Sequence, residues 1–440
     1  MGGAEPPRVP EATPGRFAAG VGFQTLGRAG HAAAALGTLI VLTRILPTSA
    51  VGVYASYLSL YALLDAGVDA GSGLTLLRRA SAEPGRLRSV LRSALRFRAG
   101  SALVFAVAGI LFAALDPRVG VANLWGWLAA ATLFSHLGGL FGTLFHVRLR
   151  FAFPSLVRAG GSLAALAGVL LLAAGGSRDP MAFLAVTLAG RVAANLALWA
   201  GAQRLLRDYP APFAGGEGGR FARESLTLGL GGILREAYGR LDVLLLRLLA
   251  GAESAGLYAP VRQTLSLALV LPSYILTVAM PPLSASAGAD PVRFRKRVRR
   301  LAGRLLLFAG PAALATLPLV PWYLGTFFEQ DYAAGAPALR ILALAAVLAY
   351  PGMVFLTALI AAGRAGRALC ISAAALGANL ALNLALIPGQ QGSGAAWARV
   401  AAEAVVLGIS VLWLGSRREG DGLPLRRKKL LSGDGRQLPG

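Results

Sequence analysis

The stretch Arg44-Ile-Leu-Pro-Thr-Ser-Ala-Val-Gly-Val-Tyr-Ala55 is the strongest indication of the fold, because a second version of it occurs about 200 residues later. The second version, Arg247-Leu-Leu-Ala-Gly-Ala-Glu-Ser-Ala-Gly-Leu-Tyr-Ala259, keeps the arginine, two aliphatic residues, a short turn and Gly-x-Tyr-Ala, with one residue inserted. Each version ends one apolar segment and begins the next, and the two lie six segments apart. Because six is even, both face the same side of a membrane. The repeat is therefore parallel, as in transporters whose halves rock around a bound substrate.

Twelve apolar segments are each long enough to cross a bilayer, for which about 20 residues are needed. The 440-residue chain is 56% hydrophobic and its mean hydropathy is +0.62, which is far from the composition of soluble proteins. The expected spans are 18–44, 51–72, 99–115, 123–147, 156–175, 181–203, 224–249, 255–283, 303–324, 336–362, 368–387 and 394–415. The sequence predicts an all-α polytopic membrane protein.

Positive charge alternates between the loops that join these segments. Of the 43 Lys and Arg, 32 lie in the N-terminal tail, every second loop with its flanks, and the C-terminal tail. The other loops hold four, namely Arg44, Arg118, Arg178 and Arg247. Because cytoplasmic loops collect Lys and Arg, both termini are expected in the cytoplasm. The net charge of +23 thus indicates contact with anionic lipid head groups and no nucleic-acid partner.

The repeat and the loop composition divide the chain into two six-helix lobes related by a pseudo-two-fold axis. We expect a disordered tail over 1–15, which lacks the pattern of a signal peptide, and an N-lobe over 16–203. A Pro- and Gly-rich cytoplasmic linker follows over 204–223. The C-lobe covers 224–415, and a basic cytoplasmic tail covers 416–440.

Several short motifs resemble one transporter family in order and spacing. The matching stretches are Leu42-Thr-Arg-Ile-Leu-Pro47, Asp69-Ala-Gly71, Arg240-Leu-Asp242, Gly256-Leu-Tyr258, Leu386-Ile-Pro388 and Gly394-Ala-Ala-Trp397. They resemble polysaccharide and lipid-linked oligosaccharide flippases, of the O-antigen flippase type, in the multidrug/oligosaccharidyl-lipid/polysaccharide exporter (MOP) superfamily. The resemblance implies two lobes forming a V around a central cavity.

The same resemblance implies a function in polysaccharide biosynthesis, such as that of lipopolysaccharide. An undecaprenyl-pyrophosphate-linked oligosaccharide would pass from the inner to the outer leaflet of a bacterial cytoplasmic membrane. A polysaccharide polymerase and glycosyltransferases would be its partners.

Arginines inside the spans are the candidate substrate ligands. An arginine at the centre of a spanning helix costs about 2.5–3.5 kcal/mol on insertion scales, so such residues should face a cavity or a partner. The candidates for a cationic cavity are Arg28, Arg191, Arg235, Arg240 and Arg262. They outnumber the acids at that depth, and guanidinium groups match phosphate oxygens, so we expect an anionic substrate.

Acidic residues inside the spans are the candidates for coupling transport to a proton or sodium ion. They are Asp65, Asp69, Glu236 and Asp242. Asp65 and Asp69 share a helical face, where two close carboxylates cannot both ionise easily. Alternatively, Asp69 caps a kink at Gly67 or Gly71, or pairs with Arg78.

Other charged and polar residues have a structural interpretation. Glu236 lies four residues before Arg240, so internal ion pairs could simply order the C-lobe. Arg399 and Glu403 are expected to form such a pair, and Arg340 is expected to extend to the membrane surface. The residues expected only to pack or to bond between helices are His31, His136, His146, Cys370, Asn379 and Asn383.

Enzymatic functions have little support. The sequence has no phosphate-binding loop and no His, Cys or Asp cluster with metal-ligand spacing, so no catalytic residues, cofactor or metal are expected. A membrane glycan polymerase or ligase would need a sizeable outer loop, but the largest offers only Glu329 and Asp331. The remaining alternative is a multidrug or small-molecule antiporter of the same superfamily, which favours an acidic, aromatic cavity for cations.

Overall fold

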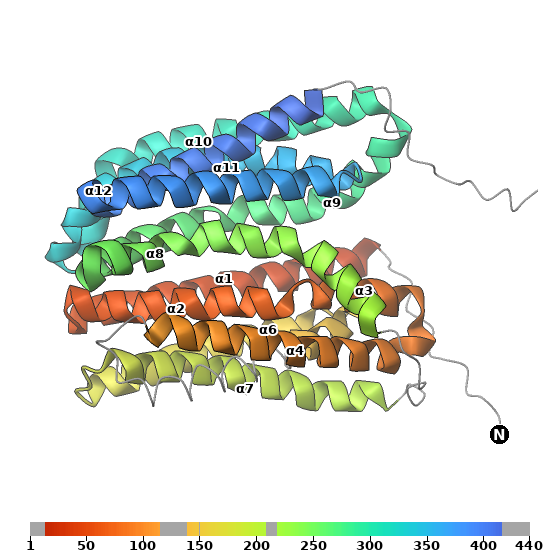
Figure 1. Ribbon diagram of the computed structural model, residues 1–440, viewed down its shortest axis with the longest axis horizontal. Helices are drawn as coiled ribbons and strands as arrows, with labels where there is room; N and C mark the ends of the chain where they lie inside the picture. Colours follow the sequence, from red (N-terminus) through yellow and green to blue (C-terminus); the bar gives the residue numbers. More distant parts are fainter. Residues whose placement is uncertain (1–13, 115–138, 149, 208–217, 416–440) are drawn as a thin grey trace, which may run out of the picture.

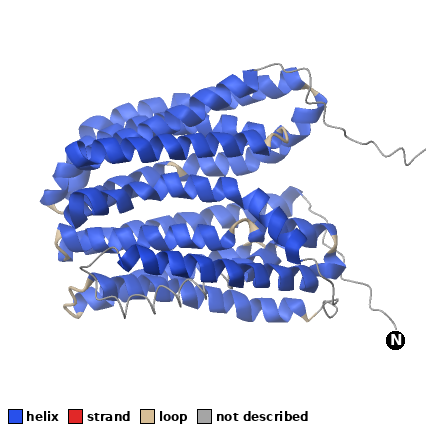
Figure 2. Ribbon diagram, in the orientation of Figure 1, coloured by secondary structure: helices blue, strands red, loops and turns tan. Residues whose placement is uncertain are grey.

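The structure, a computed structural model, describes residues 14–114, 139–148, 150–207 and 218–415. Within these ranges every regular element is a helix, and no strand occurs (Figure 2). The N-terminal helices are α1 (Pro14–Ile45), α2 (Thr48–Asp69), α3 (Ser72–Ala82), η1 (Pro84–Arg86), α4 (Leu87–Ala114), α6 (Ala152–Ala174) and α7 (Pro180–Leu206). The C-terminal helices are α8 (Gly218–Ala268), α9 (Val270–Ala289), α10 (Pro291–Phe327), η2 (Gln330–Gly335), α11 (Ala336–Ala361) and α12 (Ala365–Gly415).

The helices form two lobes (Figure 1). Helices α1, α2, α4, α6 and α7 form one layer, and α9 to α12 form the other, with α8 running between them. The predicted all-α, two-lobe fold is thereby confirmed.

Two of the helices are each long enough to cross a membrane twice. Helices α8 and α12 have 51 residues each, which at about 1.5 Å per residue is far longer than a bilayer core of about 30 Å. Each is interrupted by one non-helical residue, Gly251 with φ 89° and Gln391 with φ 47°. Among the described residues, seven helices are long and apolar enough to span a membrane, or eight if the bent α10 is included. A helix long enough for two crossings is counted once in these numbers. The fourth predicted span, 123–147, lies outside the described residues except for helical residues 139–147.

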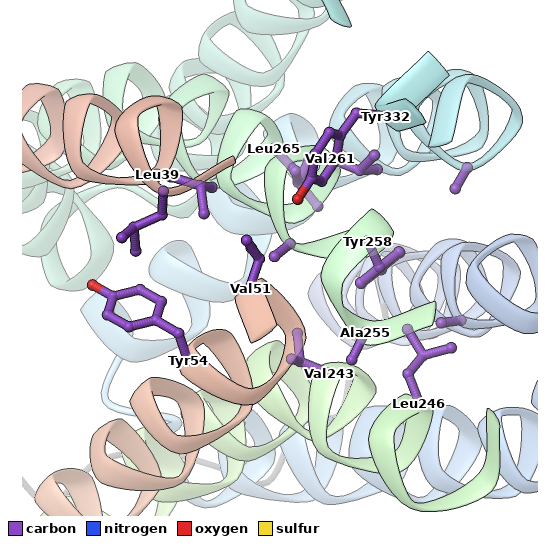
Figure 3. Packing of buried hydrophobic residues seen from close by; sticks show 14 of the residues in the cluster. Leu39, Val51, Tyr54, Val243, Leu246, Ala255, Tyr258, Val261, Leu265 and Tyr332 are labelled. Atoms are coloured by element: carbon purple, nitrogen blue, oxygen red, sulfur yellow. The ribbon is translucent and has the colours of Figure 1, made fainter. Parts of the chain in front are cut away.

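The two versions of the repeat meet each other where α2 and α8 cross. A Cβ atom at Gly52 would collide with the backbone carbonyl of Ala252, and one at Gly256 would collide with the carbonyl of Thr48. Ala252 lies four residues before Gly256, and Thr48 lies four residues before Gly52. The two contacts are therefore equivalent, as expected of two related halves. Figure 3 shows the buried side chains around this crossing, including Val51. We call this region the repeat end of the bundle.

The repeat arginines also reach across to the opposite lobe. Arg44 on α1 donates to the carbonyl of Thr326 on α10 at 3.0 Å. The guanidinium of Arg247 on α8 lies over the ring of Tyr57 on α2, 5.0 Å from its centroid. The motif that predicted the two halves therefore also joins them at the repeat end.

The lobes also touch at the opposite end of the bundle. There Gly71, whose φ of 79° suits glycine, packs against the backbone of Gly229 on α8. Arg79 on α3 pairs with Glu224 on α8 at 2.8 Å. Helix α2 thus follows α8 from one end of the bundle to the other.

Candidate functional site

A pocket of about 90 Å³ lies between the lobes, and both lobes supply its walls. We call it the interlobe pocket. Its polar side chains include His31 of α1, Arg191 of α7, and Arg240 and Arg262 of α8. It therefore brings together three of the five predicted arginines, although they are up to 71 residues apart in sequence.

A larger cavity of about 510 Å³ lies entirely within the N-lobe. We call it the N-lobe chamber. It shares His31, Ser162 and Arg191 with the interlobe pocket, so the two adjoin each other. At their junction the His31 imidazole and the Ser162 hydroxyl are hydrogen-bonded at 2.7 Å. The charged and polar side chains that line the N-lobe chamber include Arg28, Asp65, Asp69, Arg98, His146, Arg158 and Asn195.

Aromatic side chains of α2 support the N-lobe wall of the interlobe pocket. The guanidinium of Arg191 lies 5.0 Å from the centroid of the Tyr61 ring. A cation above an aromatic face is held without losing its charge, so Arg191 can still bind an anion. One turn of α7 earlier, the Thr187 hydroxyl is hydrogen-bonded to Tyr54 at 3.1 Å.

The C-lobe arginines are fixed by backbone and carboxylate oxygens of α8. Arg262 donates to the carbonyl of Gly239 through two nitrogens, at 3.1 and 3.0 Å. Its Nε lies 3.7 Å from the carboxylate of Asp242, which also accepts a hydrogen bond of 3.0 Å from Tyr258. Arg240 pairs with Glu236 one turn earlier, as the spacing predicts.

Asp69 holds the break between α2 and α3. Its carboxylate accepts hydrogen bonds from the backbone nitrogens of Gly71 and Gly73, at 3.2 and 3.3 Å. It also pairs with Arg98 of α4, which donates to Ser72 at 2.7 Å. The structure therefore favours the capping interpretation of Asp69.

Two arginines of the chamber, Arg98 and Arg158, were not predicted from the sequence as site residues. Both were expected in cytoplasmic loops, because Arg98 directly precedes the apolar segment 99–115 and Arg158 lies at the start of the segment 156–175. In the structure α4 and α6 extend beyond those segments, and both arginines lie on helices and line the chamber. By contrast, Arg235 is exposed and lines neither pocket.

Of the polar residues assigned to structure, His31 and His146 line the pockets, whereas Arg399, Glu403, Asn379 and Asn383 lie away from both. Arg399 pairs with buried Glu403 at 2.8 Å and donates to the carbonyl of Tyr238 at 3.1 Å. Asn383 donates to Asn379 within α12, to the backbone carbonyl at 2.9 Å and to the side-chain oxygen at 3.0 Å. These bonds run along one helix, whereas interhelical bonds were expected.

Positive charge exceeds negative charge in the combined site. Six arginines line the two pockets, namely Arg28, Arg98, Arg158, Arg191, Arg240 and Arg262. Four carboxylates line the chamber or pair with these arginines, namely Asp65, Asp69, Glu236 and Asp242. The excess of two positive charges suits an anionic ligand. Within the described residues, no group of three His, Cys, Asp or Glu side chains could hold a metal ion.

The profile of a family described as "Polysaccharide biosynthesis protein" matches residues 17–287, which is more than half of the chain. The chain belongs to this family. It is thus a membrane transporter of the flippase type within the MOP superfamily, and the resemblance drawn from the short motifs is confirmed. A comparison with curated proteins finds no match.

Solved structures with the same fold include both drug transporters and a lipid flippase. An inward-facing multidrug resistance MATE family transporter of the MOP superfamily is 15% identical, with a TM-score of 0.69 over 87% of this chain and 94% of that one. The lipid II flippase MurJ, in an inward closed conformation, is 12% identical, with a TM-score of 0.67 over 91% and 87%. A MOP superfamily transporter from Pyrococcus furiosus, whose binding pocket is described as of reverse polarity, is 15% identical, with a TM-score of 0.66 over 91% and 95%.

Proposed function

We propose that this transporter moves an undecaprenyl-pyrophosphate-linked oligosaccharide from the inner to the outer leaflet of a bacterial cytoplasmic membrane. The observation that carries the proposal is the convergence of arginines from both lobes on two adjoining pockets. Each phosphate of such a substrate ionises, and guanidinium groups bind phosphate oxygens through paired donors.

The two pockets have different parts in this proposal. The diphosphate binds in the interlobe pocket, between Arg191 of the N-lobe and Arg240 and Arg262 of the C-lobe. The first sugars enter the N-lobe chamber, whose polar wall includes Asn195 and Thr143. Because the diphosphate contacts both lobes, its binding favours the conformation in which they approach each other. With both termini in the cytoplasm, the rocking of the lobes then exposes the site to each leaflet in turn.

Transport is proposed to be coupled to a proton or sodium ion. Our first choice for the coupling residue is Asp65, because it lines the chamber one helical turn from Asp69 and two carboxylates this close cannot both ionise easily. In proteoliposomes, Asp65→Asn should leave substrate binding intact and make flipping insensitive to an imposed pH or sodium gradient. Full gradient dependence in that variant would exclude this role.

The alternative function, an antiporter of cationic drugs, is disfavoured by the positive net charge of the site, where six arginines accompany four carboxylates. The two functions are separated by a flipping assay in proteoliposomes containing a fluorescent undecaprenyl-pyrophosphate-linked sugar. We expect transfer of this lipid between leaflets, and no accumulation of ethidium. Ethidium accumulation without lipid transfer would favour the antiporter.

One matched pair of variants tests the arginines in that assay. Arg240→Ala should reduce flipping by tenfold or more, since a charged hydrogen bond is worth about 1.5–3 kcal/mol. Arg240→Lys should recover part of the rate, because the charge remains without the paired donors. Arg235→Ala, on the same helix but outside both pockets, is the control and should flip normally. Equal losses in both alanine variants would refute the proposed site.

A further inference from the structure

A second large cavity, of about 490 Å³, lies on the C-lobe side of the interlobe pocket. Its walls come from α1, α8, α10 and α11, and its lining is almost entirely aliphatic or aromatic. Two of its residues on α10, Leu319 and Trp322, are 52% and 60% exposed, so the cavity extends to the lipid-facing surface. We call it the apolar cavity.

The hydroxyl groups that line the apolar cavity already have partners within the protein. The Thr264 hydroxyl donates to the carbonyl of Pro260 at 2.9 Å and is hydrogen-bonded to the Tyr323 hydroxyl at 3.0 Å. The Tyr350 hydroxyl donates to the carbonyl of Ala268 at 2.7 Å. A polar ligand would therefore lose its water without gaining hydrogen bonds. The chemistry of this cavity suits a hydrocarbon chain.

The shape of α10 creates this space. The helix contains Pro311, Pro318 and Pro321, and its segments before residue 314 and after residue 316 meet at 64°. Proline in a helix interior removes a backbone hydrogen bond and bends the helix. Small side chains on both sides, including Ala312 and Ala343, leave the space at the bend unfilled. A cavity with apolar walls stays free of water and takes up apolar molecules.

Two inner helices line both the apolar cavity and the interlobe pocket. On α8, Arg262 lines the interlobe pocket and Leu265, one turn later, lines the apolar cavity. On α1, Ala35 lines the interlobe pocket and Leu36 lines the apolar cavity. A hydrocarbon chain attached to a diphosphate beside Arg262 would therefore meet the apolar cavity within its first few carbon units.

We propose that the apolar cavity binds the isoprenyl chain of the substrate close to its diphosphate. This inference rests on the proposed function, because it takes the diphosphate to lie beside Arg262. The protein would then recognise both the charged group and the adjacent chain, and it would prefer an isoprenyl diphosphate to a free diphosphate.

The test compares two soluble probes, inorganic pyrophosphate and farnesyl diphosphate, by calorimetry on the purified full-length chain in nanodiscs. The wild type should bind farnesyl diphosphate at least about tenfold more tightly, which corresponds to burying about two methylene groups. Ala343→Phe and Ala312→Phe fill the cavity from different helices, and in each the ratio of the two affinities should fall towards one. Leu344→Phe is the matched control, because Leu344 lies beside Ala343 but is 44% exposed and outside the lining. Its ratio should equal that of the wild type.

The outcomes separate this inference from the proposed function. If pyrophosphate binds but the filled variants keep the wild-type ratio, the chain lies elsewhere and only this inference fails. If the wild type binds neither probe, both fail. A diazirine-bearing farnesyl diphosphate should label 309–323 or 339–350. If a diazirine-bearing phosphatidylcholine labels these segments equally and farnesyl diphosphate does not displace it, the cavity holds ordinary bilayer lipid and the inference is overturned.

Discussion

Substituting Gly52 by alanine should prevent the two repeat versions from closing on each other. The added Cβ would lie 2.8 Å from the carbonyl carbon of Ala252 and 2.8 Å from the backbone nitrogen of Gly256. Because carbon atoms pack at about 3.5–4.0 Å, the helices must separate by roughly 1 Å or more. Overpacking of this kind costs about 1–3 kcal/mol. That energy corresponds to a shift of about 5–150-fold in a conformational equilibrium, away from the closed repeat end.

The shift can be measured as a distance distribution by electron paramagnetic resonance. Spin labels at Ser49 and Glu253, both exposed at the repeat end, report the separation of α2 and α8 once Cys370 has been replaced by serine. Gly52→Ala should populate longer distances and slow flipping. Gly232→Ala is the control, because its added Cβ would meet no other part of the protein within 4 Å beyond its own stretch of helix. Distances and flipping that match this control would refute the assigned closure of the repeat end.

Three stability predictions follow from the ion pairs, each measured as the thermal unfolding of the purified protein in detergent. Arg399→Met leaves the Glu403 carboxylate buried and unpaired and should cost about 3–5 kcal/mol. Replacing both Arg399 and Glu403 by Met should restore most of this stability, and an equal loss in the single and double variants would contradict the assignment. Asp69→Asn removes the carboxylate charge that pairs with Arg98, a residue only 4% exposed, and should cost about 1–3 kcal/mol, discounted because the Asp69 side chain is 42% exposed. Unchanged unfolding would exclude a role of Asp69 in stabilising the break. Glu83→Gln breaks the exposed ion pair with Arg86 and should change stability by less than about 0.5 kcal/mol. A larger loss would contradict the small contribution expected of an exposed pair.

Much of the fold could be predicted from the sequence because hydrophobic length and repetition are local signals. The Arg44–Ala55 motif and its second version predicted two related halves, and in the structure the two versions touch. The i,i+4 spacing predicted the pair between Glu236 and Arg240, because such residues lie on adjacent turns of one helix face. The predicted placement of both termini in the cytoplasm rests on the charge pattern of the loops.

The site was only partly predictable, because the depth of a charge depends on where each helix begins. Hydropathy places Arg98 and Arg158 at the edges of apolar segments, yet the helices continue past those edges and bury Arg98 beside Asp69. Conversely, Arg235 lies deep in an apolar segment, but its side chain is exposed and outside both pockets. Sequence depth alone does not determine which face of a helix meets the other lobe.

The apolar cavity illustrates a further limit of the sequence. The prolines of α10 are visible in the chain, but a proline predicts only a bend and not what the bend leaves open. The cavity depends on alanines of α10 and α11 that lie opposite each other, and these are ordinary packing residues in sequence. The apolar cavity lies beside the arginines because α1 and α8 line both spaces, and this arrangement depends on the packing of helices far apart in sequence.

The most direct test of a cationic site shared by both lobes is the affinity for an undecaprenyl-pyrophosphate-linked sugar, measured at equilibrium in nanodiscs. We compare Arg191→Ala, which alters the N-lobe wall, with Arg262→Ala, which alters the C-lobe wall. A diphosphate held between the lobes predicts that each variant weakens binding by about tenfold or more, with the folded fraction monitored by thermal unfolding. Wild-type affinity in either folded variant would contradict a site formed by both lobes.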